Sequence, residues 1–126
     1  MISIGTDIVQ IERVEAVLQR QGERFVKRIL TPQEIEEYRA SRMGHRLLAK
    51  RFAAKEALAK ALGTGIGRDV SWQDIRIDHN AAGAPIVALS GGARRLVDAR
   101  GGAAVQLSLA DEMDYVVAFA LIDSRQ

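Results

Sequence analysis

The sequence predicts an α+β fold, in which an N-terminal strand and several helices surround one long central helix and are followed by a mainly antiparallel sheet. Residues 47–62 are rich in alanine and leucine and lack proline and glycine, which favours a helix of about four turns. Residues 2–9 have the pattern of a short strand, and most segments after residue 75 alternate with a period of two. Because helices and strands are grouped, the order favours α+β over a parallel α/β fold.

Length and composition predict one domain spanning residues 1–126. The net charge of +2 is too small to indicate nucleic-acid binding, and 5% aromatic residues leave few platforms for stacking bases. The absence of cysteine excludes disulfides, thiolate metal sites and a cysteine nucleophile. No apolar run approaches the roughly 20 residues of a membrane span. We therefore expect a cytoplasmic protein without a nucleic-acid or membrane partner.

The predicted N-terminal strand places Ile2 and Ile4 on one side and ends between Gly5 and Asp7. Asp7 then lies where the strand gives way to a helix. An aspartate at that point is either a helix cap or turn residue, which is its commonest use, or part of a functional site. The sequence up to this point leaves both interpretations open.

Three helical segments are expected before the central helix. Residues 11–21 have one apolar face and end at Gly22, and residues 23–30 form a second helical piece. Thr31, Pro32 and Glu34 have the pattern of a capping box, so a third helix is predicted from residue 32 to about residue 39.

The central helix has an apolar stripe and one pair of charges four residues apart. Glu56 and Lys60 lie on neighbouring turns of one face, where such a pair is most often a solvated ion pair of small energetic value. The stripe that is expected to face the core consists of Leu47, Leu48, Phe52, Ala59 and Leu62.

The glycine-rich loop after the central helix favours a functional role for Glu56 and Lys60. Three alternating glycines in residues 63–67 allow backbone N–H groups to approach a ligand closely. The C-terminal end of a helix disfavours a phosphate, so Lys60 would have to supply the compensating charge. The loop follows a helix and lacks Gly-Lys-Ser/Thr, which excludes a dinucleotide fingerprint and a P-loop.

The C-terminal half is predicted to be mostly strands. Residues 75–77 and 85–89 form two strands separated by turn residues, and residues 93–100 form a short helix. Residues 105–109 alternate, whereas residues 115–122 are continuously apolar, like a strand covered on both faces. The acidic turn at residues 110–114 is expected to be solvated rather than to bind a cation.

Two motifs together resemble the signatures of the 4′-phosphopantetheinyl transferases. They are Gly5-Thr-Asp-Ile-Val9 and, about 50 residues later, a segment that runs from Arg51-Phe-Ala-Ala-Lys-Glu-Ala through Lys60 to Gly65. The short chain, the segment Arg28-Ile-Leu-Thr31 and the turn Gly83-Ala84-Pro85 are similar to the small bacterial type, the holo-[acyl-carrier-protein] synthases. The resemblance covers nearly the whole chain and implies a phosphopantetheinyl-transferase-like fold.

The resemblance implies an Mg-dependent enzyme that transfers the 4′-phosphopantetheine arm of coenzyme A to a serine of apo acyl carrier protein. Adenosine 3′,5′-bisphosphate is the other product, and the reaction supports fatty acid biosynthesis. Asp7 and Glu56 are the implied Mg2+ ligands, and magnesium accepts one or two carboxylates together with phosphate oxygens. Asp7, Glu56 and Lys60 are the implied catalytic residues, with Lys60 stabilising the leaving phosphate. The serine proton goes to a metal-held water or to a carboxylate.

The resemblance also implies where the substrates bind. Coenzyme A is expected at Arg51, Lys60, Gly63, Thr64 and Gly65. Arg51 points away from Glu56 on a helical wheel, which suits the homotrimer with active sites between subunits that is typical of the family.

The basic residues Arg13, Arg24 and Arg28 match positions that receive an acidic helix of the carrier protein, although exposed arginines are common without such a role. The chain lacks the lysine that is frequent in the family's Gly-Lys-Pro turn, and it lacks a histidine that some members carry at residues 109–110. His45 and His79 are therefore interpreted as surface residues.

Two other functions are compatible with the same residues. A small basic module could bind a nucleotide or RNA, although the charge and the aromatic content argue against it. A magnesium-dependent hydrolase of coenzyme A or another nucleotide could use the same carboxylates with water as the acceptor. The need for a protein serine distinguishes the transferase from the hydrolase.

Overall fold

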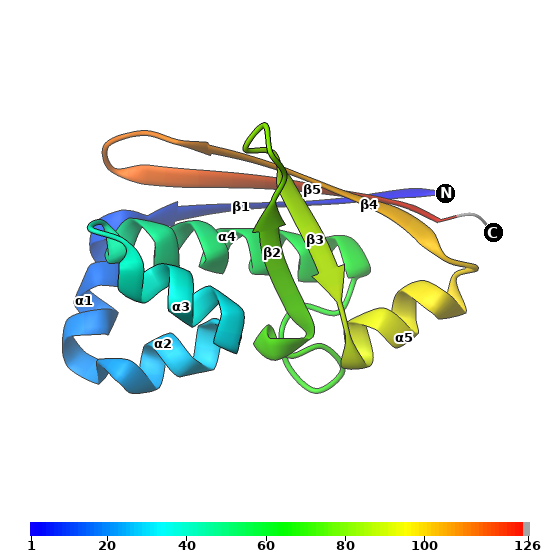
Figure 1. The fold of residues 1–126 in the computed structure, drawn as a ribbon. Helices are drawn as coiled ribbons and strands as arrows, with labels where there is room; N and C mark the ends of the chain where they lie inside the picture. The colour runs from blue at the N-terminus through cyan, green and yellow to red at the C-terminus, as the bar shows by residue number, and fades with distance from the viewer. Residues whose placement is uncertain (125–126) are drawn as a thin grey trace.

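A computed structural model describes residues 1–124 of the chain. One long helix lies against one face of a three-stranded sheet, with three helices at one end, a two-stranded hairpin crossing the middle and a short helix toward the other end (Figure 1). The elements are β1 (Ile2–Gln10), α1 (Ile11–Gln21), α2 (Glu23–Ile29), α3 (Pro32–Ala40), α4 (Gly44–Leu62), the 3-10 helix η1 (Trp72–Asp74), β2 (Ile75–His79), β3 (Pro85–Leu89), α5 (Gly91–Ala99), β4 (Ala103–Asp111) and β5 (Tyr115–Ser124).

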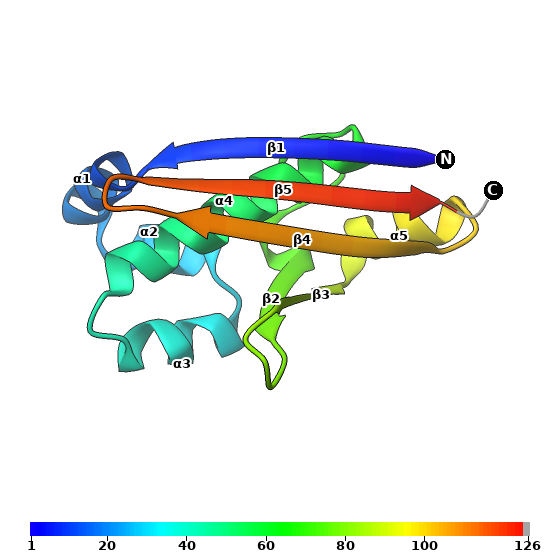
Figure 2. The same ribbon diagram turned by 90° about the horizontal axis from the view of Figure 1, so that it is seen from above.

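The larger sheet has the order β1-β5-β4, and both pairs are antiparallel. Its three strands lie side by side over α4 when the molecule is viewed from above (Figure 2). β2 and β3 form a separate antiparallel hairpin. The predicted α+β fold with a central helix and mainly antiparallel strands is confirmed.

Helix α4 lies at the centre of the core, because its many small alanine side chains let neighbouring elements pack close to it. The helix begins at Gly44, three residues before the predicted start, and ends at Gly63, which adopts a left-handed conformation with φ 85°. All five residues of the predicted apolar stripe are buried or half-buried. Contacts with β1 and β5 bury the alanine-rich face of the helix.

The strand β1 is longer than the sequence predicts and extends to Gln10. Asp7 therefore lies inside the strand, opposite Ala118 of β5, and the residue before α1 is Gln10. The interpretation of Asp7 as a helix cap is wrong, because pairing with β5 continues the strand past it. Ile2 and Ile4 do share one side, but that side faces solvent in the isolated chain.

The last strand, β5, is covered on one face only, which corrects the prediction that it is covered on both. Val116, Ala118 and Ala120 are buried against the core, whereas the alternating Tyr115, Val117 and Phe119 are exposed. The outward face of β1 and β5 carries Ile2, Ile4, Ile8, Tyr115, Val117 and Phe119, all at least 39% exposed.

The capping box at the start of α3 is confirmed, and its glutamate has a second role. Glu34 accepts the Thr31 N–H at 2.8 Å, and its carboxylate also accepts the Lys55 ammonium at 2.6 Å and the Ile77 N–H at 3.0 Å. Burial lowers the pKa of Lys55, and the neighbouring Glu34 opposes that shift. A buried ion pair is stable only when its hydrogen bonds are complete, as they are for this lysine.

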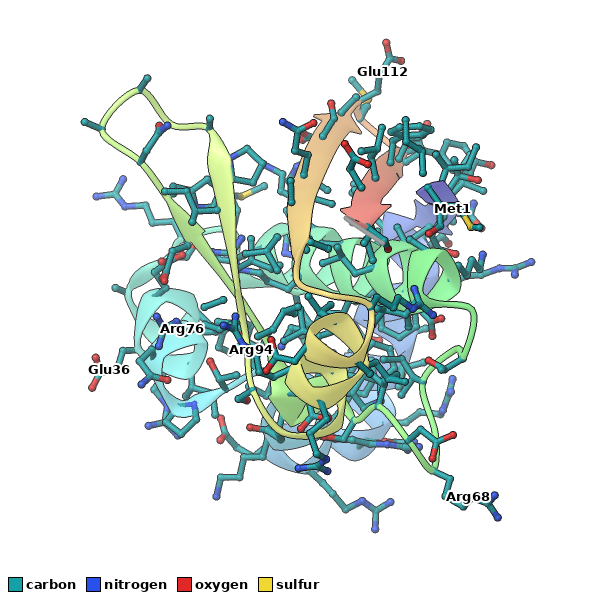
Figure 3. The ribbon with its side chains drawn as sticks, turned by 90° about the vertical axis from the view of Figure 1, so that its right-hand side faces the viewer. Met1, Glu36, Arg68, Arg76, Arg94 and Glu112 are labelled. Atoms are coloured by element: carbon teal, nitrogen blue, oxygen red, sulfur yellow. The ribbon has the colours of Figure 1, made fainter. Side chains whose placement is uncertain are left out.

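The turn between β4 and β5 is solvated, as predicted, but it is also fixed to α4. Arg46 donates to Asp111 Oδ2 at 2.8 Å, to the Met113 carbonyl oxygen at 3.0 Å and to the Glu112 carbonyl oxygen. The Arg46 hydrogen bond holds the pKa of Asp111 below its usual range. Figure 3 shows the Glu112 side chain at the tip of this hairpin, pointing away from the fold. Within residues 1–124, no helix is long and apolar enough to cross a membrane.

Candidate functional site

The site begins with a close approach between β1 and α4 at Gly5. A Cβ atom at Gly5 would lie 2.1 Å from the Ala57 carbonyl oxygen and 2.6 Å from the Ala61 nitrogen. Only glycine permits that separation, so the strand lies directly on the helix backbone. Two residues further along β1, Asp7 points to the same side of the strand as Gly5. The glycine of the first motif thus brings the aspartate to the helix.

Asp7, Glu56 and Lys60 come together at this point. Lys60 Nζ donates to Asp7 Oδ1 at 3.1 Å and to the Thr6 carbonyl oxygen at 3.0 Å. Lys60 therefore forms its ion pair with Asp7 on β1. Glu56 and Lys60, four residues apart on α4, form a cluster of three charged residues with Asp7. The structure brings together all three residues that the resemblance named as catalytic.

The environment of Glu56 disfavours its charged form. Burial raises the pKa of Glu56 above its usual range, the charge of Asp7 raises it further, and Lys60 partly opposes both effects. Asp7 Oδ2 is buried and has no hydrogen-bond partner among the described residues. Lys60 pairs with Oδ1 only, so the buried Oδ2, beside a second carboxylate, is costly while it has no partner of its own.

The residues present fit a magnesium ion. Two carboxylates supply hard oxygen ligands, and the partnerless Asp7 Oδ2 supplies an acceptor that no protein donor occupies. No group of three or more His, Cys, Asp or Glu side chains within residues 1–124 could hold a metal. Two carboxylates suffice for Mg2+ when phosphate oxygens and water complete its shell, as they do in phosphoryl-transfer sites.

The glycine loop differs from the sequence expectation. The N–H groups of Thr64 and Gly65 both donate to the Ala59 carbonyl oxygen, at 3.2 and 3.1 Å, and the Gly63 N–H donates to the Lys60 carbonyl oxygen. These three donors close the end of α4, whose last carbonyls need partners, and do not point outward to a phosphate. A Cβ atom added at Gly63 or at Gly65 would meet no other atom within 4 Å, so the loop does leave open space for a ligand.

Arg51 does not join the cluster within one chain. Its side chain is 2% exposed, and it donates to Glu37 Oε2 at 2.6 Å on the α3 side of α4. Arg51 Nε is 3.5 Å from Glu34 Oε2 and lacks a hydrogen bond among the described residues. The helical-wheel expectation that Arg51 points away from Glu56 agrees with this position.

The three predicted docking arginines lie on the surface of α1 and α2. Arg13 on α1 and Arg24 and Arg28 on α2 are all exposed. Arg13 borders an apolar groove of about 280 Å³ whose lining also includes Ile8, the residue after Asp7. The other lining residues are Val9, Gln10, Val14, Val17, Phe25 and Phe52.

Sequence reasoning missed two features that build the site. The first is Gly5, which had been noted only as part of a motif, although a glycine inside a strand is a signal of close backbone approach. The second is Lys55, which lies beside Glu56 in the motif and is fully buried. The interpretation of the two histidines is confirmed for His79, which is exposed, whereas His45 is half-buried, with Nε2 3.5 Å from Glu15 Oε2.

Comparison with known proteins agrees with this geometry. Residues 3–120 match the model of the 4′-phosphopantetheinyl transferase superfamily. A holo-[acyl-carrier-protein] synthase of Vibrio cholerae is 46% identical over 125 residues, which cover 99% of each chain. One from Shewanella amazonensis is 51% identical over 122 residues, 97% of this chain and 98% of the relative.

Solved structures agree as well. The holo-[acyl-carrier-protein] synthase of Neisseria meningitidis has a TM-score of 0.92 and 43% identity, covering 98% of this chain and 99% of that one. The Bacillus anthracis enzyme, solved in complex with CoA (3′,5′-ADP), has a TM-score of 0.82 and 34% identity, covering 97% and 96%. With the family match and the full-length similarity together, the chain belongs to the 4′-phosphopantetheinyl transferase superfamily.

Proposed function

We propose that this protein is a holo-[acyl-carrier-protein] synthase, which transfers the 4′-phosphopantetheine arm of coenzyme A to a serine of apo acyl carrier protein. The observation that carries the proposal is the cluster of Asp7, Glu56 and Lys60, in which Asp7 Oδ2 has no hydrogen-bond partner among the residues that the structure describes. Full-length relatives have this name, and a similar protein has been solved with coenzyme A. The products are holo carrier protein and adenosine 3′,5′-bisphosphate, and the reaction would serve fatty acid biosynthesis in the cytoplasm.

The proposed chemistry is a phosphoryl transfer. The serine oxygen forms a bond to the phosphorus that bears the pantetheine arm, the bond from that phosphorus to the bridging oxygen breaks, and adenosine 3′,5′-bisphosphate leaves with the electron pair. Asp7 and Glu56 would hold Mg2+, which when bound neutralises charge on the pyrophosphate. Lys60 is half-exposed and lies beside Asp7, so its ammonium can donate to the leaving phosphate.

The fate of the serine proton is also assigned to this cluster. A water held by the metal, or one of the two carboxylates, would accept the proton, since a base must lie within hydrogen-bond reach of the serine hydroxyl.

Substrate binding is proposed to involve both sides of α4. Coenzyme A would lie over Lys60, Gly63, Thr64 and Gly65 on one protomer, and Arg51 would reach it only from a neighbouring protomer. The donors of the glycine loop already close the helix, so the loop would supply room for the ligand rather than N–H bonds. Arg13, Arg24 and Arg28 would receive the acidic carrier protein.

We further propose a homotrimer with active sites between subunits. The outward face of β1 and β5 presents exposed Ile4, Ile8, Val117 and Phe119 as one apolar surface. A small domain gains stability by covering such a surface with a second copy. Sedimentation equilibrium tests this point: three chains per particle are expected, and a monomer at micromolar concentration would contradict it.

The experiment that tests the function is intact-mass spectrometry of apo acyl carrier protein incubated with this protein, coenzyme A and magnesium. A chelator-sensitive mass increase of about 340 Da, the mass of one phosphopantetheine arm carried through a phosphoryl transfer, is expected. Consumption of coenzyme A without a mass increase would instead indicate the hydrolase. A mass increase that survives the chelator would contradict the metal assignment alone.

A further inference from the structure

The C-terminal end of α2 is held by side chains from two other elements. A helix leaves its last carbonyl groups without partners in the helix itself. In α2, Gln73 Nε2 donates to the Lys27 carbonyl oxygen at 3.0 Å and to that of Leu30 at 2.8 Å, and it lies 3.4 Å from that of Arg28. Lys55 Nζ donates to the carbonyl oxygen of Ile29 at 2.7 Å. The terminal carbonyls of this short helix are therefore satisfied by η1 and α4.

The two donors are also connected to each other. Lys55 Nζ donates to the Trp72 carbonyl oxygen at 3.1 Å, and Gln73 is the next residue. The Trp72 ring lies 5.0 Å from that of Phe52 on α4, and Phe52 lies 6.5 Å from Phe25 on α2, measured between ring centroids. Helix α2, η1 and α4 thus form one packed unit, held by hydrogen bonds at one end and by aromatic rings along its length.

This unit joins two parts of the proposed reaction. Arg24 and Arg28 lie four residues apart on α2 and are exposed, and Glu56 directly follows Lys55 on α4. The serine can receive the phosphopantetheine arm only if the carrier protein is held at the right distance from the reaction centre. Any movement of α2 relative to α4 would move the docking arginines relative to Glu56.

We propose that Gln73 and Lys55 are positioning residues, which fix the C-terminal end of α2 and so hold Arg24 and Arg28 at a set distance from Glu56. The inference rests on the proposed function, because it assigns α2 to carrier-protein docking. Gln73 is the residue to test. It is exposed, so its substitution leaves the core intact, whereas removing Lys55 would take the closest cationic partner from the buried Glu34.

The main variant is Gln73→Met, which keeps the shape of the side chain and removes both N–H donors. One hydrogen bond corresponds to a change of about two- to tenfold, so we expect the KM for apo carrier protein to rise by that factor. The KM for coenzyme A and the value of kcat should stay within twofold of wild type. The matched control is Gln33→Met, on the exposed first turn of α3.

A rescue variant separates positioning from general damage. Gln73→Lys restores a donor to the carbonyls, and Gln33→Lys adds the same charge nearby without that contact. Rescue of the carrier-protein KM by Gln73→Lys, beyond any effect of Gln33→Lys, supports the proposal. An unchanged carrier-protein KM in Gln73→Met, or an equal loss in kcat and both KM values, would overturn it.

Hydrogen exchange keeps the test separate from the proposed function. Amides in the last turn of α2 and at Leu30, whose N–H donates to the Val26 carbonyl oxygen at 2.9 Å, should exchange faster in Gln73→Met, while those of α4 and β5 keep the wild-type rate. Unchanged exchange in α2 would overturn the anchoring itself. If wild-type protein transfers no arm to the carrier protein, the proposed function fails, whatever the exchange experiment shows.

Discussion

Helix α4 carries two charged clusters that differ in how completely their polar atoms are satisfied. In the interior cluster, Lys55 is fully buried and donates to three acceptors, one of them Glu34. In the surface cluster, Lys60 is half-exposed, and Asp7 keeps one buried oxygen that has no hydrogen-bond partner within residues 1–124. Lys55 therefore needs no ligand, although Arg51 Nε, 3.5 Å from Glu34 Oε2, also lacks a hydrogen-bond partner within residues 1–124. Arg51 is enclosed, with 2% of its side chain exposed, whereas Asp7 lies beside the half-exposed Lys60. An unsatisfied polar atom next to a solvent-exposed side chain, rather than charge alone, distinguishes the proposed functional cluster from the structural one.

The largest effect should come from breaking the interior cluster. Lys55→Met would remove the closest cation of the buried Glu34 carboxylate and leave only Arg51 Nε, 3.5 Å away, so we expect the free energy of unfolding to fall by about 3–5 kcal/mol. Urea denaturation measures this change. Combining Lys55→Met with Glu34→Gln should recover part of the loss, since the buried charge is then removed. A loss within 1 kcal/mol would show that the pair contributes little.

Breaking the surface cluster should have the opposite pattern. Glu56→Gln is expected to lower kcat for phosphopantetheine transfer by roughly 10²- to 10³-fold, because a metal ligand and a proton acceptor are lost. Stability should be equal or higher, because the substitution removes a repulsive carboxylate beside Asp7. Transfer kinetics and urea denaturation of the same preparation measure both quantities. Near wild-type turnover would contradict the assignment of Glu56.

The contact that joins strand and helix offers an intermediate case. Gly5→Ala forces a methyl group against the Ala57 carbonyl oxygen, and overpacking of this kind costs about 1–3 kcal/mol. Transfer activity should fall by more than the loss of folded protein accounts for, because the strand that carries Asp7 must move away from Lys60. Activity measured at a temperature where the variant is fully folded separates the two effects.

Charge reversal at a docking residue should leave both clusters intact. For Arg13→Glu we expect the KM for carrier protein to rise about threefold to tenfold, from the loss and reversal of one exposed charge contact. The KM for coenzyme A should be unchanged. The difference from wild type should shrink as salt is added, because exposed charges are screened. Equal loss toward both substrates would remove the docking assignment.

The smallest expected effect is a pH dependence of stability. The folded-state pKa of Glu56 lies above that of an ordinary carboxyl group, about 4.3 in the unfolded chain, so the folded state binds the proton more tightly. This contribution to the free energy of unfolding is complete below the unfolded-state pKa and is lost as the pH rises through the raised value. When a chelator is present, the free energy of unfolding of wild type minus that of Glu56→Gln should therefore fall as the pH rises. A flat difference would contradict the shifted pKa.

The difference between the two clusters also explains what the sequence could predict. The capping box of Thr31 and Glu34 is a local pattern, and it was predicted correctly. The bond from Glu34 to Lys55 joins residues 21 apart, and no spacing rule indicates it. Glu56 and Lys60 were singled out by their spacing on one helix, whereas the partner of Lys60 lies 53 residues away on β1.

The errors have a common physical origin. The local sequence predicts Asp7 at the end of a strand. The strand in fact continues to Gln10, because its pairing with the distant β5 determines its extent. Residues 115–122 of β5 are all apolar, which predicts a strand covered on both faces, yet α4 covers only one. The N–H groups of the glycine loop were expected to face a ligand, but the end of α4 uses them. In each case a distant or competing partner decided the outcome.

The pairing of β1 with β5 has a consequence for how the molecule is made. Ile2 lies opposite Asp123, so nearly the whole chain separates the two strands. Contacts of such separation form late, because a long loop must close before they contribute. During synthesis α4 leaves the ribosome well before β5, the strand beside β1. Asp7 is therefore the last member of its cluster to be fixed, and a nascent chain that ends before residue 115 carries Glu56 and Lys60 without a strand to hold their partner.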